Sequence, residues 1–124
     1  MSKSLAAAFV AVTIALTVYG QLVIKWQVLD AGDFPATWGE RISFLGRLLI
    51  NPWVISCFVA AGVAALFYIS ALTRFDLSVV YPFMALSFVF VLVLSSVFFG
   101  ESITPLKTIG IGLIVAGLAI GAQS

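Results

Sequence analysis

A single lysine near the end of a long apolar run is the residue best placed to bind a ligand. Lys25 is the only full charge in the run from residue 5 to residue 28. A charge inside a membrane span costs roughly 2.5–3.5 kcal/mol on insertion scales, so it should face a partner, a cavity or the interface. We therefore expect Lys25 to bind an anion inside a groove between helices. The alternative is that it snorkels, since it lies roughly 12 Å from the span centre at about 1.5 Å per residue.

Polar side chains precede Lys25 at helical spacing. Gln21, Thr17 and Thr13 follow one another at intervals of four, which places them on one broad stripe of a helix. The stripe predicts a polar groove between helices, with Thr17 and Gln21 as substrate-binding residues. Tyr81 offers a ring and a hydroxyl at the other end of that groove, unless it is an interfacial tyrosine.

Three further charges lie in connections close to the Lys25 end of the groove. Glu101 follows the third apolar run, where it either pairs with Lys25 or remains a turn residue near the positive start of the last helix. Arg41 and Arg47 lie in the polar segment after the first run.

Several kinds of chemistry are not expected. The chain has no His and a single Cys, so a metal site, a cofactor or a disulfide framework is not predicted. Its net charge of +1 gives no footprint for nucleic acid. No nucleophile–base set is visible, so we do not expect an enzyme. No Asp or Glu lies inside an apolar run, and a proton-coupled exporter would need one there.

The elements that position these residues are membrane spans. Of the 124 residues, 63% are hydrophobic and 9% charged, against about 25% charged in a soluble domain. Asn51-Pro52 and Thr104-Pro105 read as N-caps followed by proline at the first helical position, and Pro82 lies in the first turn of the third span or kinks it. We predict an all-α integral membrane protein with short loops, a single domain over residues 1–124. Its four spans run over about 5–28, 52–73, 77–99 and 105–122.

The polar segment 29–51 contains its own periodicity. Trp38, Ile42, Leu45 and Leu49 recur at spacings of three and four, which predicts a short amphipathic helix lying in the membrane interface. The alternative is an irregular loop. We call the membrane face with both termini side A and the other side B. The positive-inside rule puts side B in the cytoplasm, because it carries four of the six basic residues: Lys25, Arg41, Arg47 and Lys107, against Lys3 and Arg74 on side A.

The last span carries a face of small residues. Gly110, Gly117 and Gly121 fall on one side of the helix, where small residues let two backbones approach closely in lipid. This predicts a dimer interface, whereas the alternative is packing within one protomer.

Together these motifs resemble the drug/metabolite transporter superfamily. The resemblance rests on Gly20-Gln21-Leu22 with Lys25, the stretch from Tyr81-Pro82 to Val89, Glu101 and the last-helix glycines. Small multidrug resistance exporters are similar at Tyr81 and over the stretch 110–117. However, Thr17 stands where they have an essential glutamate, and Met84 where they have a tryptophan.

The flippase subunits for 4-amino-4-deoxy-arabinose on undecaprenyl phosphate resemble the chain more closely, over most of it except 31–47. This resemblance implies a bacterial inner-membrane flippase for an anionic lipid-linked sugar, working as a homodimer or with a paralogous subunit. The phosphate would meet Lys25 and either Arg41 or Arg47, and the sugar would pass Thr17, Gln21 and Tyr81. The alternatives are an exporter of small cations or metabolites and an accessory subunit of a membrane glycosyltransferase.

Overall fold

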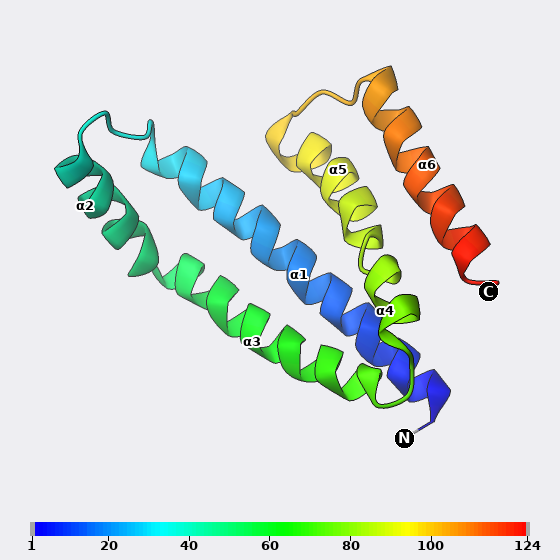
Figure 1. The fold of residues 1–124 in the computed structure, drawn as a ribbon. Helices are drawn as coiled ribbons and strands as arrows, with labels where there is room; N and C mark the ends of the chain where they lie inside the picture. Colours follow the sequence, from blue (N-terminus) through cyan, green and yellow to red (C-terminus); the bar gives the residue numbers. More distant parts are fainter. Residues whose placement is uncertain (1, 124) are drawn as a thin grey trace.

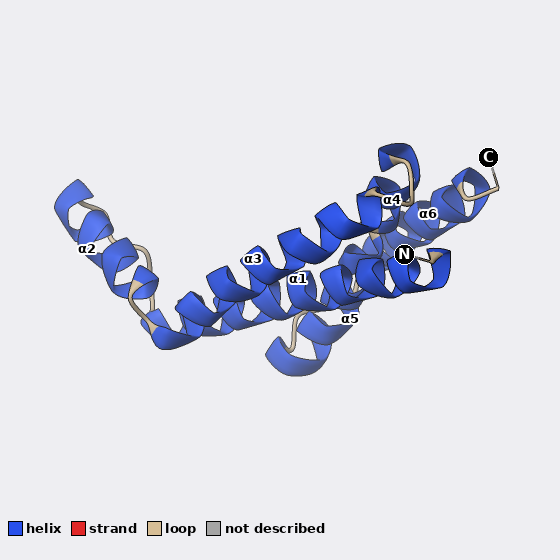
Figure 2. Cartoon of the chain, turned by 90° about the horizontal axis from the view of Figure 1, so that it is seen from below, coloured by secondary structure: helices blue, strands red, loops and turns tan. Residues whose placement is uncertain are grey.

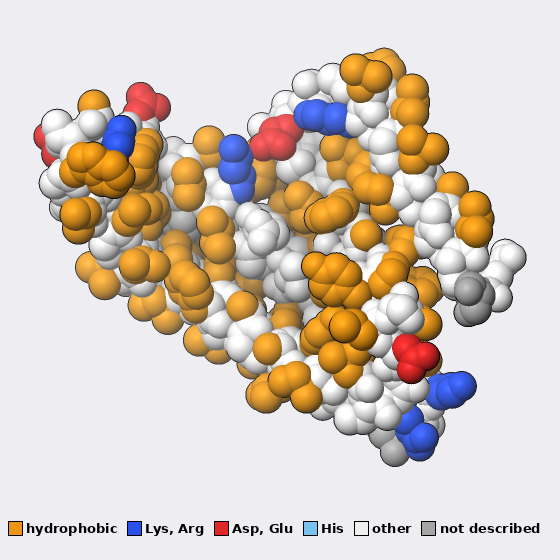
Figure 3. Space-filling model, viewed as in Figure 1, with side chains coloured by type: hydrophobic (Ala, Val, Ile, Leu, Met, Phe, Trp, Pro, Cys, Tyr) orange, Lys and Arg blue, Asp and Glu red, His pale blue; other side chains and the backbone are white. Residues whose placement is uncertain are grey.

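The protein is an all-α membrane protein. A computed structural model describes residues 2–123, and within that range all regular structure is helical. The helices α1 (Lys3–Ala31), α3 (Pro52–Leu72) and the stretch Leu77–Phe99 are long and apolar enough to cross a membrane, and α6 (Pro105–Gly121) is a shorter apolar helix. Figure 1 shows them side by side, with both termini at one end of the bundle. Charged side chains gather at the two ends, and the face between them is largely hydrophobic (Figure 3).

The closest packing in the bundle joins α1 to α3. Ala60, Ala64 and Ala71 of α3 are buried, and such small side chains let two backbones approach closely in lipid. The Thr13 hydroxyl of α1 is within 3.4 Å of the Ala64 carbonyl oxygen. The core of the protomer is therefore a two-helix seam rather than a central cluster of large side chains.

Two predicted helix starts are confirmed. The Asn51 side chain accepts a hydrogen bond from the Trp53 amide at 2.9 Å and begins α3. The Thr104 hydroxyl accepts from the Lys107 amide at 3.2 Å and begins α6. The first helix is longer than predicted: α1 ends at Ala31 instead of Val28.

The predicted helix in the polar segment is also present. It is α2 (Trp38–Leu49), capped by the Thr37 hydroxyl, which accepts from the Glu40 amide at 3.4 Å. Figure 2 shows α2 beyond the end of the α1–α3 pair and at an angle to it. Its predicted apolar residues, Trp38, Ile42, Leu45 and Leu49, are all exposed, whereas Phe44 is buried. That the exposed face lies in the membrane interface remains a prediction.

The third predicted span is not one continuous helix. It consists of α4 (Leu77–Phe83) and α5 (Leu86–Phe99), separated at Met84 and Ala85. Pro82 has no amide hydrogen and its ring crowds the preceding turn. Around the break, backbone hydrogen bonds join residues three apart instead of four. The Ala85 amide donates to the Pro82 carbonyl and the Ser87 amide to the Met84 carbonyl, both at 3.0 Å. The break leaves Pro82, Met84 and Ala85 free to line a cavity.

Helix α6 contacts the rest of the protomer only sparsely, through α4 and α5. Leu118 is buried, whereas Leu106 and Ile120 are 81% and 72% exposed. A Cβ atom added at Gly110, Gly117 or Gly121 would meet nothing within 4 Å. The glycine face is thus not used for packing inside the protomer.

Candidate functional site: a polar groove beside α1

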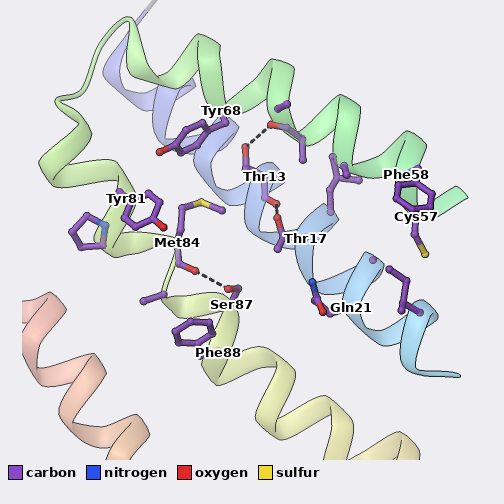
Figure 4. A pocket seen from close by; sticks show the side chains of 18 residues that line it. Thr13, Thr17, Gln21, Cys57, Phe58, Tyr68, Tyr81, Met84, Ser87 and Phe88 are labelled. Atoms are coloured by element: carbon purple, nitrogen blue, oxygen red, sulfur yellow. Dashed lines mark hydrogen bonds between the residues drawn. The ribbon is translucent and has the colours of Figure 1, made fainter. Parts of the chain in front are cut away.

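The predicted polar stripe on α1 borders a cavity of about 640 Å³, which we call the central cavity. Its walls come from α1, α3 and the break between α4 and α5, and it includes Thr13, Thr17, Gln21 and Tyr81. Figure 4 shows Tyr81 beside the α4–α5 break and Gln21 toward the opposite end of the cavity. The structure therefore brings three of the predicted substrate-binding residues, Thr17, Gln21 and Tyr81, to one cavity.

The two threonines satisfy their own hydroxyl groups within the helix. Thr13 donates to the Phe9 carbonyl and Thr17 to the Thr13 carbonyl, each at 2.8 Å. Gln21, one turn further, is exposed and forms no hydrogen bond with the residues that the structure describes. Its amide therefore keeps both donor and acceptor capacity for a ligand.

A second opening, the lateral groove, lies between α1, α5 and α6 and holds about 710 Å³. It shares Thr17, Gln21, Ser87 and Phe88 with the central cavity, so the two spaces adjoin along the same side chains. Ser87 donates to the Met84 carbonyl at 2.7 Å, as expected for a serine within an apolar helix. The polar stripe thus faces two adjoining open spaces rather than a closed pocket.

The side B end of these adjoining spaces is charged. The Lys25 ammonium lies 3.7 Å from a Glu101 carboxylate oxygen, which confirms the pairing interpretation of Glu101. Lys107 donates to the Ser102 carbonyl at 3.1 Å, and both Glu101 and Lys107 line the lateral groove. We call Lys25, Glu101 and Lys107 the mouth.

The ion pair at the mouth is open to solvent. The side chains of Lys25 and Glu101 are 47% and 43% exposed. Pairs of this kind are worth about 0–1 kcal/mol, because solvent and salt screen them. An anionic ligand would therefore compete readily with Glu101 for the ammonium.

The two arginines of α2 do not join Lys25 at the mouth. Arg41 lies over the rings of Phe34 and Trp38, at 5.2 and 5.0 Å, and donates to the Pro35 carbonyl at 2.8 Å. Arg47 lines a separate small pocket where α1, α2 and α3 meet. The structure thus separates these candidates from the cavity that holds Gln21 and Tyr81.

The structure adds residues to the site that sequence reasoning missed. Tyr68 and Cys57 of α3 line the central cavity, and Lys107 of α6 lines the lateral groove. Tyr68 follows Ala64 by one helical turn, so both lie on the face of α3 that packs on α1. The spacing from the small residues of α3 could therefore have predicted that Tyr68 faces α1. Among residues 2–123, no group of three or more His, Cys, Asp or Glu side chains lies together as a metal site would require.

Comparison of the sequence with known proteins places the chain among transporters. The sequence model of the EamA-like transporter family matches residues 2–121. A protein of Aeromonas hydrophila named "Probable 4-amino-4-deoxy-L-arabinose-phosphoundecaprenol flippase subunit ArnE" is 34% identical over 102 residues, covering 82% of this chain and 83% of its own.

Two further relatives extend the comparison. A protein of the same name from Pseudomonas aeruginosa is 28% identical over 125 aligned residues, covering 97% of this chain and 99% of its own. "Uncharacterized protein y4nH" of Sinorhizobium fredii is 30% identical over 105 residues, covering 84% of this chain and 83% of its own. No solved structure matches the chain.

Proposed function

Because the chain belongs to the EamA-like transporter family, we propose that it is one subunit of a flippase for an anionic lipid-linked sugar in a bacterial inner membrane. The relatives named as flippase subunits for 4-amino-4-deoxy-L-arabinose-phosphoundecaprenol support this substrate class. The observation that carries the proposal is a stripe of polar side chains along a largely apolar path, whose charged end at Glu101 meets Lys25. The path runs from Tyr81 past Thr17 and Gln21 in the central cavity and lateral groove, and Lys25 and Glu101 stand at its side B mouth.

The path suits a substrate with a polar head and an apolar tail. The phosphate binds the Lys25 ammonium, and the sugar hydroxyl groups exchange hydrogen bonds with the unpaired Gln21 amide and then with the Tyr81 hydroxyl. Tyr81 and Phe88 are 68% and 58% exposed on the protomer, so the path is open at its side. The polyprenyl chain stays in the surrounding lipid, so its apolar surface is not exposed to water while the head group crosses the membrane.

The second part of the proposal is that the subunit works in a dimer, either with a second copy or with a paralogue. Gly110, Gly117 and Gly121 form an open face on a helix that has little contact with its own protomer. Close backbone approach across such a face provides van der Waals contact, which drives helix association in lipid. The partner's helices would complete the wall of the lateral groove that α6 borders.

Replacing Lys25 tests the substrate part of the proposal. Lys25→Met keeps the length of the side chain and removes its charge. A charge-assisted hydrogen bond is worth about 1.5–3 kcal/mol, so substrate binding should weaken about 10- to 150-fold. Lys25→Arg should retain part of the activity, because the charge is kept. The measurement is translocation of the lipid-linked sugar in proteoliposomes, alongside the amount of folded protein.

The control is Lys3→Met, the same substitution at the other end of α1, where the side chain is exposed and far along the helix from the mouth. It should transport normally. Full transport by Lys25→Met at normal expression would mean that Lys25 only snorkels. Loss of folded protein in Lys25→Met, restored by the added change Glu101→Gln, would make the lysine a partner of Glu101 rather than of phosphate.

A further inference from the structure

A small pocket that the proposed path does not use lies where α1, α2 and α3 meet. It holds about 230 Å³, and we call it the junction pocket. In Figure 1 this is the corner where the end of α1, the helix α2 and the start of α3 come together. Polar and charged side chains supply much of its lining, which consists of Gln27, Asp30, Ala31, Phe44, Arg47, Leu48 and Asn51.

A chain of hydrogen bonds fixes the orientation of one amide in this pocket. The Trp53 amide donates to Asn51 Oδ1 at 2.9 Å, so the Asn51 NH₂ group is the part left to donate. It donates to Gln27 Oε1 at 3.0 Å. Gln27 must therefore turn its oxygen toward Asn51 and its own NH₂ group away from it.

The NH₂ group of Gln27 is an unmet donor that faces the pocket. The Gln27 side chain is only 6% exposed, and its NH₂ group has no hydrogen-bond partner among the described residues. No fully buried side-chain nitrogen or oxygen in residues 2–123 lacks a partner, so this group must reach the open space that Gln27 lines. A donor placed in this way is available to water or to an acceptor atom of a ligand in the pocket.

The pocket also holds two opposite charges that do not neutralise each other. Asp30 and Arg47 both line it, and within the described part of the chain neither forms an ion pair or a hydrogen bond. Their charged atoms are therefore more than 4.0 Å apart. A ligand with one positive and one negative group could satisfy both charges at once.

The depth of the pocket indicates what kind of ligand reaches it. The rings of Trp26 and Trp53, neighbours of the pocket in sequence, pack against each other at 5.2 Å. Tryptophans of membrane proteins gather at the level of the lipid headgroups. The 29 residues of α1 extend about 44 Å at 1.5 Å per residue, longer than a hydrocarbon core of about 30 Å. We therefore infer that Gln27 and Asp30, at its end, lie at the level of the headgroups.

We propose that the junction pocket binds a lipid headgroup that carries both a phosphate and a primary ammonium group. Arg47 and the Gln27 NH₂ group donate to the phosphate oxygens, and the Asp30 carboxylate accepts from the ammonium. The buried ring of Phe44 forms the apolar wall of the pocket. Two lipids share this chemistry, a bilayer phosphatidylethanolamine and a lipid-linked amino sugar. The site is separate from the mouth at Lys25, so it does not depend on the proposed function.

The test measures lipid binding rather than transport. Purified protein in detergent is titrated with phosphatidylethanolamine, phosphatidylglycerol or phosphatidylcholine, and bound lipid is counted by native mass spectrometry. Wild-type protein should prefer phosphatidylethanolamine, because phosphatidylglycerol has no cation and phosphatidylcholine has no N–H donor. Asp30→Asn and Arg47→Gln should each weaken phosphatidylethanolamine binding about tenfold. In Asp30→Asn the preference over phosphatidylglycerol should disappear.

The matched control is Asp33→Asn, which removes a carboxylate three residues along, in the connection outside the pocket. It should bind like the wild type. Equal binding of the three lipids by the wild type would overturn the proposal even if the variants failed to fold. So would variants that fold and bind phosphatidylethanolamine as well as Asp33→Asn does. Once binding is established, the lipid-linked amino sugar is added as a competitor. If it displaces phosphatidylethanolamine, the lipid-linked amino sugar is also an occupant of the pocket. If it does not, the pocket binds bilayer lipid.

Discussion

The seam between α1 and α3 and the glycine face of α6 are built from the same kind of residue, but only the first is closed within the protomer. Ala60 and Ala64 are buried against α1. Gly110 and Gly117 on α6 have open space around them. Both surfaces offer small side chains that let backbones approach in lipid, so composition alone does not tell which one is internal.

The difference lies in what each surface meets. The α1–α3 seam adds specific contacts to its small residues. The Thr13 hydroxyl shares its proton between the Phe9 carbonyl and, at 3.4 Å, the Ala64 carbonyl. The rings of Phe9 and Phe67 meet edge to face, 4.9 Å apart. Among the described residues, one ion pair, Lys25 with Glu101, ties the connection before α6 to α1. The seam is therefore a fixed part of the protomer, whereas the α6 face is available to a partner.

The largest expected effect comes from filling the closed seam. Ala60→Leu places a large side chain where the present one is 8% exposed and does not line the central cavity, and overpacking of this kind costs about 1–3 kcal/mol. Unfolding in mixed detergent micelles should show this loss. Ala61→Leu is the control, because Ala61 is exposed and borders the central cavity, where there is room. Equal stability of the two variants would mean that the seam is not the core of the protomer.

A leucine placed on the open face of α6 should weaken dimer formation without destabilising the protomer. Gly117→Leu should not destabilise the monomer, since nothing lies within 4 Å of an added Cβ and leucine favours a helix more than glycine does. It should weaken the dimer about tenfold or more, equivalent to at least about 1.4 kcal/mol. Cross-linking in membranes or energy transfer between labelled copies measures this.

Gly112→Leu is the matched control for that experiment. Gly112 is also open but points away from Gly110 and Gly117 around the helix. It should dimerise normally. A dimer that tolerates Gly117→Leu, or that Gly112→Leu disrupts equally, would remove the distinction between the two faces of α6.

The smallest expected effect comes from removing the ion pair between Lys25 of α1 and Glu101, in the connection before α6. Glu101→Gln removes the ion pair with Lys25, whose side chains are about half exposed, so the free energy of unfolding should fall by about 1 kcal/mol at most. The difference from wild type should shrink further in high salt, because exposed charges are screened. A loss of several kcal/mol that persists in high salt would show that α6 is fixed to α1 much more firmly than the contacts indicate.

Much of this architecture was predictable because its causes are local. Asn51-Pro52 and Thr104-Pro105 begin helices where the cap residues predicted, since a cap is an interaction among neighbours in the chain. The spacing of apolar residues predicted α2 for the same reason. The sequence left two alternatives for Pro82, a place in the first turn of the third span or a kink in it. The packing around Pro82 decides between them, and the structure has a break at Met84 and Ala85.

The candidate site divides along the same line. The sequence by itself determined the membrane fold, the polar stripe that includes Thr17 and Gln21, and an isolated cation at the end of that stripe, because apolar length and helical spacing follow from the chain alone. Only the tertiary structure decided that Glu101 meets Lys25 while Arg47 joins Gln27 and Asp30 in another pocket. Those pairings depend on where separate helices end in space, and residue spacing within one helix carries no information about that.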